Sequence, residues 1–220
     1  MVYPQFNMNY RYKLNRLPIL IDRQNTTSTT YDSDNSLLVD YKFNDYGYRA
    51  SFDYEPLLNS EKIVCIGCSF TEGVGLDEEE TWPYLLSKKI GLPFLNLGKA
   101  GGSDGYVMWQ IMNVLKNIQT KNIFVLSPPS GRFFELSDTN FESRQAWDVE
   151  TPTESYSNFY DLNSFVLNAL CHRYKIPHIN SLELGTGYRW TKAKDNQHFG
   201  FDYQNIIAEE FYKITQQKLI

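Results

Sequence analysis

Residues 62–75 read KIVCIGCSFTEGVG and give the clearest indication of how this chain folds. The first six residues are a short, mostly apolar run that ends in glycine, which is typical of a buried parallel strand. The small residues that follow predict a turn in which the Ser69 hydroxyl is exposed and its backbone N–H is available to an oxyanion. In open α/β sheets the reactive groups lie at the carboxyl ends of the strands. Ser69 is therefore the first candidate nucleophile.

The rest of the chain after residue 62 alternates between strand and helix patterns. Runs at 92–97, 122–126 and 177–180 predict strands, and apolar periodicity predicts helices at 78–90, 103–119, about 162–174 and about 203–216. Such alternation predicts a parallel sheet covered on both faces, that is, a three-layer α/β/α domain with about five strands. Residues 127–157 are too long for a plain connection and predict a functional loop.

The first 60 residues have a different composition, rich in Tyr, Asn, Asp and Thr. The polar tract at 25–30 predicts a loop, whereas the runs at 17–21 and 36–43 fit short strands or extended arms. We interpret residues 1–60 as an N-terminal extension that packs on the domain at 61–220 or contacts a partner.

Composition excludes several classes of function. With 42% hydrophobic residues, the chain of 220 residues can bury a full core. The net charge is −5 and the basic residues are scattered, which argues against nucleic acid as a partner. No apolar run approaches the roughly 18–20 residues that span a bilayer, and no signal peptide is visible, so we expect a cytoplasmic protein without a membrane partner. Three cysteines do not make a disulfide framework.

Two further loops follow predicted strands or precede the last helix. Residues 96–103 read NLGKAGGS, in which the glycines allow a backbone N–H to approach a substrate closely. Residues 195–198 read DNQH, so that the Asp195 carboxylate, three residues before His198, can reach its Nδ1 and direct Nε2 toward a nucleophile.

These three segments resemble the conserved blocks of the SGNH (GDSL) hydrolases. The GCSFT sequence at 67–71 is similar to block I, where Gly-Asp-Ser is commoner; NLGKAG at 96–101 is similar to block II; and the DxxH of 195–198 is similar to the last block. The resemblance covers about residues 45–215 and includes Gly47-Tyr48-Arg49, as in bacterial and phage members. It implies a flavodoxin-like α/β/α domain and a Ser69–His198–Asp195 triad. It also implies an oxyanion hole formed by the N–H groups of Ser69 and Gly101, with no cofactor and no metal.

The chain departs from the family pattern at block III, which normally provides an Asn side chain to the oxyanion hole. The corresponding residues 126–132 read LSPPSGR. Candidates to replace the Asn as substrate-binding groups are Arg132 and the hydroxyls of Ser127 and Ser130. Since losing one such donor typically costs about 10²–10³ in rate, reduced activity is compatible with this sequence.

Other signals have simpler explanations. Cys65 and Cys68 have CxxC spacing, but Cys65 lies within the apolar strand run, which disfavours a redox or metal site. The glycines of 67–75 lack the Lys-Ser/Thr of a phosphate-binding loop. His172 and His178 are interpreted as structural.

Three functions remain open on the sequence. The preferred one is a serine esterase acting on a small acyl ester; a carbohydrate O-acetyl ester is suggested by the family resemblance. An O-acyltransferase would use the same site with a sugar hydroxyl as the acceptor. A non-catalytic binding or structural module, such as a virion-associated one, would keep the fold without the chemistry.

Overall fold

The computed structural model of the chain describes residues 10–11, 17, 19–20, 23–31, 37–118, 120, 122–129, 132–136, 141–145, 154–181, 184 and 190–217. Within these residues, four parallel strands form the central sheet. Their order is β10 (His178–Asn180), β7 (Ile123–Ser127), β5 (Ile63–Ile66) and β6 (Phe94–Asn96). The predicted α/β/α class is confirmed, with four strands in the described part of the sheet where about five were predicted.

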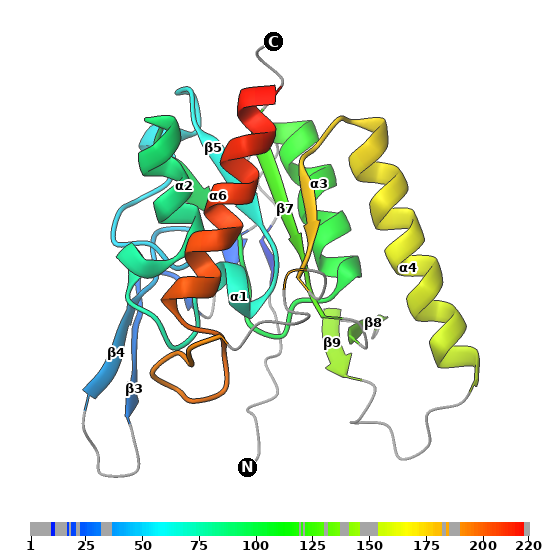
Figure 1. Cartoon of the computed structure of the whole chain (residues 1–220), viewed down its shortest axis with the longest axis horizontal. Helices are drawn as coiled ribbons and strands as arrows, with labels where there is room; N and C mark the ends of the chain where they lie inside the picture. The colour runs from blue at the N-terminus through cyan, green and yellow to red at the C-terminus, as the bar shows by residue number, and fades with distance from the viewer. Residues whose placement is uncertain are drawn as a thin grey trace.

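Helices cover both faces of this sheet (Figure 1). One face packs against α3 (Asp104–Asn117) and α4 (Glu154–Arg173), and the other against α2 (Trp82–Ile90) and α6 (Phe201–Gln217). Successive residues of a strand point to opposite faces, and β5 follows this rule. Val64 and Ile66 join the core under α3 and α4, whereas Ile63 and Cys65 join the core under α2 and α6.

The carboxyl ends of the strands lie together at one end of the sheet. Val64 pairs with both Leu95 and Ile123, so β6, β5 and β7 end side by side. At this end α1 (Ser69–Glu72) follows β5 after only two residues. The backbone is tightly packed here, because a Cβ on Gly67 would lie 2.7 Å from the Leu126 carbonyl oxygen.

The N-terminal segment adds two antiparallel strand pairs. β1 (Tyr10–Arg11) pairs with β2 (Ile19–Leu20), and β3 (Thr27–Tyr31) pairs with β4 (Leu37–Lys42), before the 3-10 helix η2 (Glu55–Leu57). Leu17, Leu20 and Tyr54 are buried in the same cluster as β5. The prediction of a loop at 25–30 was wrong from residue 27 onward, where β-branched threonines pair with β4.

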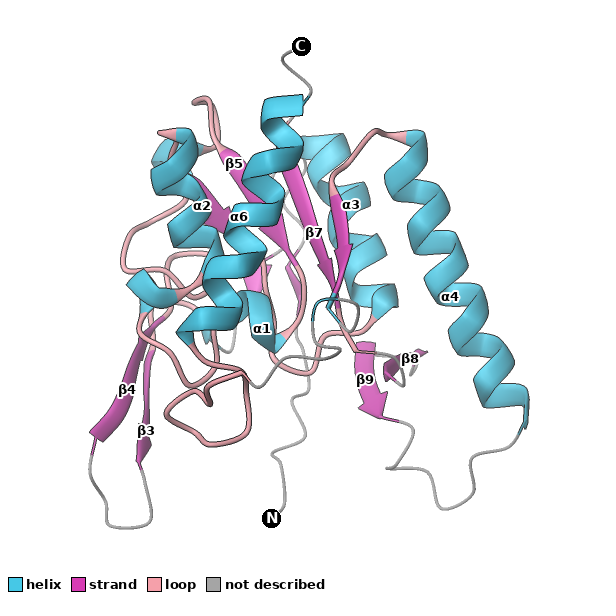
Figure 2. Cartoon of the chain, in the orientation of Figure 1, coloured by secondary structure: helices cyan, strands magenta, loops and turns pink. Residues whose placement is uncertain are grey.

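Two other predictions need correction. The expected helix at 78–90 is divided into the 3-10 helix η3 (Glu78–Glu80) and α2, because Thr81 between them is extended and Pro83 occupies the first turn of α2. The expected loop at 127–157 contains an antiparallel pair, β8 (Arg132–Leu136) and β9 (Phe141–Gln145), and the start of α4 (Figure 2).

Among the described residues, no helix combines the length and apolar character needed to cross a bilayer.

Candidate active site

Asp195 and His198 contact each other in the turn at 195–198. Asp195 Oδ2 lies 2.6 Å from His198 Nδ1, and Asp195 Oδ1 accepts the backbone N–H groups of Gln197 and His198. Asn196 has a left-handed φ of 58°, which closes the turn between the two side chains. Burial raises the pKa of Asp195, but its hydrogen bonds from His198 outweigh burial and hold that pKa below the ordinary value. The carboxylate is therefore ionised and orients the imidazole.

This turn lies against the segment that carries the candidate nucleophile. The Lys194 N–H donates to the Gly75 carbonyl at 2.9 Å, and the rings of Phe70 and His198 meet edge to face at 5.5 Å. A Cβ on Gly75 would lie 2.7 Å from Asp195 Oδ1. The fold thus brings the last predicted block beside the first.

Ser69 is the first residue of α1 and is buried, with 3% of its surface exposed. Its Oγ contacts Cys68 Sγ at 4.0 Å and has no other hydrogen-bond partner in the described part of the chain. Over the same residues, His198 Nε2 makes no hydrogen bond, so the Ser69–His198 bond of a working triad is not formed. Catalytic hydrogen bonds of this kind often tighten only when substrate binds.

The two predicted oxyanion donors lie on neighbouring loops. The backbone N–H of Ser69 has no acceptor among the described residues. Gly101 has a left-handed φ of 75° and open space where a Cβ would be. Asn96 joins the loops, because its Nδ2 donates to the Thr71 carbonyl at 2.8 Å and its Oδ1 accepts the Gly98 N–H at 3.0 Å.

Of the three candidates to replace the block III Asn, the structure describes the side chain of Ser127 alone. Ser127 ends β7, is 5% exposed, and its Oγ shares a hydrogen bond with Nε2 of His178. Burial lowers the pKa of His178, which favours a neutral imidazole. His178 was interpreted as structural, and in the structure it holds Ser127, a candidate site residue. Ser130 and the side chain of Arg132 lie outside the described residues, and Arg132 itself begins β8.

His172 is exposed in the last turn of α4. The structure gives it no contact with the candidate triad in the residues described.

Sequence reasoning missed a charged group beneath these loops. Glu72 is 4% exposed; its carboxylate pairs with Arg23 and accepts the N–H of Ala100. Lys99 is 5% exposed, and burial lowers the pKa of its ammonium to about 8. No sequence spacing could reveal this group, because Arg23 lies far from the other three residues along the chain.

The cysteines are all free. Cys65 belongs to the buried apolar cluster under α2 and α6, where burial raises the pKa of its thiol well above the ordinary value. In the described segments, no group of three His, Cys, Asp or Glu side chains could hold a metal ion.

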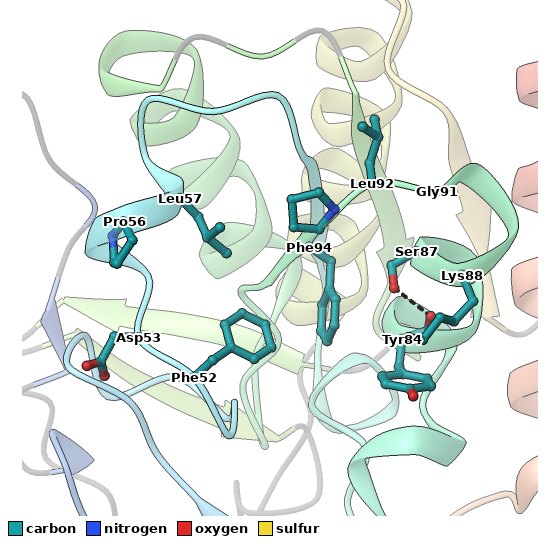
Figure 3. A pocket seen from close by; sticks show the side chains of 11 residues that line it. Phe52, Asp53, Pro56, Leu57, Tyr84, Ser87, Lys88, Gly91, Leu92 and Phe94 are labelled. Carbon is teal, nitrogen blue, oxygen red and sulfur yellow. Dashed lines mark hydrogen bonds between the residues drawn. The ribbon is translucent and has the colours of Figure 1, made fainter.

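A cavity of about 750 Å³ lies at the other end of the sheet, where β6 begins. Figure 3 shows Phe52, Leu57 and Phe94 around it, with Tyr84 and Lys88 contributed by α2. Of the predicted site residues whose side chains the structure describes, none lines this cavity.

The solved structures that are similar to this chain include GDSL-family proteins and esterases. They include a lipolytic G-D-S-L family protein from Desulfitobacterium hafniense at 12% identity and TM-score 0.46, covering 70% of this chain and 99% of that one. A lipolytic G-D-S-L family protein from Veillonella parvula has 13% identity and TM-score 0.42, with 70% and 98% covered. A carbohydrate acetylesterase family member from Sinorhizobium meliloti has 12% identity and TM-score 0.39, with 71% and 98% covered. No protein-family model and no curated protein matches the chain.

Proposed function

We propose that this chain is a serine esterase that hydrolyses a small acyl ester through Ser69, His198 and Asp195. The observation that carries the proposal is the 2.6 Å contact between Asp195 and His198, in a turn that packs on Gly75 and Phe70 of the Ser69 segment. An aspartate that holds Nδ1 leaves Nε2 as the base, which is the arrangement that activates a serine hydroxyl.

The reaction follows from these roles. His198 Nε2 takes the proton of Ser69 Oγ as that oxygen attacks the ester carbonyl, and Asp195 stabilises the imidazolium. The backbone N–H groups of Ser69 and Gly101 donate to the developing oxyanion. His198 then returns the proton to the departing alkoxide, and water hydrolyses the acyl-enzyme with the same base.

The acyl and alcohol halves of the substrate are a further part of the proposal. The carbohydrate acetylesterase among the similar structures makes an O-acetylated carbohydrate the first substrate class to test. Release of free acetate would support hydrolysis, and acetyl transfer to an added sugar would support the acyltransferase alternative.

The direct test is hydrolysis of p-nitrophenyl acetate by the wild type, Ser69→Ala and His198→Ala. We expect both variants to lose at least about 10³-fold in kcat/KM, because members of a triad act as one unit. His172→Ala serves as the matched control, since this histidine is exposed on α4, and its rate should equal that of the wild type. Equal rates in all four proteins would refute the proposal.

One observation favours a second candidate, a non-catalytic binding module. Ser69 is buried and, in the part of the chain described, its Oγ lacks a bond to His198. A chain of this kind would leave Ser69 unlabelled by a fluorophosphonate probe. Labelling of the wild type that Ser69→Ala abolishes would exclude this candidate.

A further inference from the structure

Glu72 ends the short helix α1 that begins with Ser69. Its side chain is buried, and both carboxylate oxygens are used: Oε1 pairs with Arg23, and Oε2 accepts the backbone N–H of Ala100. Ala100 immediately precedes Gly101, the candidate oxyanion donor. One carboxylate therefore connects the nucleophile helix, the block II loop and the N-terminal segment.

A buried carboxylate is costly unless other groups compensate for its lost hydration. Burial alone would raise the pKa of Glu72. The charge and hydrogen bond of Arg23, the Ala100 N–H and the charge of Arg49 outweigh burial and hold this pKa below the ordinary value. Glu72 is therefore ionised at neutral pH and a strong acceptor for the Ala100 amide.

The backbones of the two loops touch at the same place. A Cβ on Gly98 would lie 2.3 Å from the Glu72 nitrogen, so only glycine permits this approach. Arg49 donates to the carbonyls of Glu72 and Gly73, and the Tyr41 hydroxyl accepts the Gly75 N–H at 2.8 Å. The N-terminal segment thus contacts the nucleophile loop through several side chains.

We propose that Glu72 is a positioning residue for the oxyanion hole and that Arg23 of the N-terminal segment is needed for this role. The carboxylate fixes the Ala100 amide, and with it the next peptide unit, which carries the Gly101 N–H. Because Ser69 and Glu72 lie in one helical turn, the distance between the Ser69 hydroxyl and the Gly101 N–H is kept constant. This inference rests on the proposed esterase function.

The variants Glu72→Ala, Glu72→Gln and Arg23→Met test the proposal, with Lys89→Met as the control. Lys89 forms a partly exposed ion pair with Glu209 between α2 and α6, away from the site. We expect Glu72→Ala to lower kcat by about tenfold or more with KM within about threefold, because displacing an oxyanion donor affects mainly the transition state. Glu72→Gln keeps an acceptor for Ala100 and should recover part of kcat. Arg23→Met should lower kcat, and Lys89→Met should leave it unchanged.

Amide hydrogen exchange at Ala100 and Gly101 gives a second measurement that does not depend on turnover. We expect both amides to exchange faster in Glu72→Ala and Arg23→Met than in the wild type, while amides of β5 and β7 keep their protection. Faster exchange at the β5 amides would identify a variant that is generally unfolded. If Glu72→Ala is unfolded in this way, Arg23→Met tests the proposal in its place, because Arg23 is only half-buried.

Unchanged kcat in folded Glu72→Ala overturns the proposal, and so does unchanged exchange at Ala100. Loss of kcat that Glu72→Gln does not relieve at all also counts against it. Failure of the esterase function itself has a different signature: Ser69→Ala would then retain the full rate of the wild type.

Discussion

Gly75 shows how little space the candidate site leaves beside the Asp195 carboxylate. Its φ is 81°, and a Cβ would lie 2.7 Å from Asp195 Oδ1 and 2.8 Å from the Ala193 Cβ. We expect Gly75→Ala to displace Asp195 from His198 and to lower kcat/KM by about 10²-fold, in the range seen when a supporting group shifts by about 1 Å. Steady-state hydrolysis of p-nitrophenyl acetate measures the effect.

Gly91→Ala is the matched control for this substitution. Gly91 has nearly the same φ, 78°, but nothing lies within 4 Å of its added Cβ. Backbone strain should therefore lower the unfolding free energy of both variants by about 1 kcal/mol. Gly75→Ala should lose more than this, because its Cβ also meets Asp195 and Ala193, and only Gly75→Ala should lose activity. Equal activity in the two variants would show that the contact with Asp195 does not matter for turnover.

The same residues show what sequence can predict of a site. Asp195 and His198 lie three residues apart in a turn, so their contact follows from local spacing. In the sequence Glu72 looks like an ordinary solvated glutamate, because its partners Arg23 and Ala100 are brought to it only by the fold. Local chemistry was predictable, and the buried charge that supports it was not.

Among the elements, α1 is held by a side chain that is distant in the sequence. Its C-terminal carbonyls and the loop after it are bonded by Arg49, which donates to Glu72, Gly73 and Leu76 and stacks on the Tyr41 ring. We expect Arg49→Lys to lower the unfolding free energy by about 2–3 kcal/mol, because lysine cannot supply the guanidinium's fork of donors. Urea unfolding measures this value.

Lys194→Met, which breaks an ion pair with Asp77 that is exposed to solvent, should cost under about 1 kcal/mol. A similar loss in Arg49→Lys and Lys194→Met would mean that the three bonds to carbonyls contribute little.

The helices and strands themselves were predicted from periodicity where it was strong. The patterns for β5, β7 and α6 gave nearly the observed bounds. Predictions failed where a neighbour or a backbone constraint decides: Thr27–Tyr31 is polar but is a strand because it pairs with β4, and Thr81 interrupts the acidic start of the helix expected at 78–90. Pairing partners and extended residues cannot be identified from one segment alone.

At the scale of the whole molecule, we expect one buried lysine, Lys99, to affect how the free energy of unfolding depends on pH. Lys99 has a pKa of about 8 against an ordinary value of 10.5, chiefly because burial disfavours its charged form, with the charge of Arg23 adding to the effect. Its ammonium makes no hydrogen bond to any described residue and lies 5.9 Å from the Tyr106 ring centroid. Below pH 8 the folded protein therefore holds a buried ammonium, whose cost the charge of Glu72 offsets only in part.

The pH dependence follows from proton binding. Between pH 8 and 10.5 the unfolded chain holds this proton and the folded chain does not, so stability from Lys99 rises with pH in this window. We expect Lys99→Met to stabilise the protein at pH 7 by on the order of 3 kcal/mol and to lose this advantage as the pH approaches 10.5. Urea unfolding at pH 7, 8, 9 and 10 measures the difference, with the exposed Lys116→Met as control. A Lys99→Met protein that is less stable than the wild type at pH 7 would show that the ammonium stabilises the loop carrying Gly101, and the lysine would then belong to the supporting charges of the site.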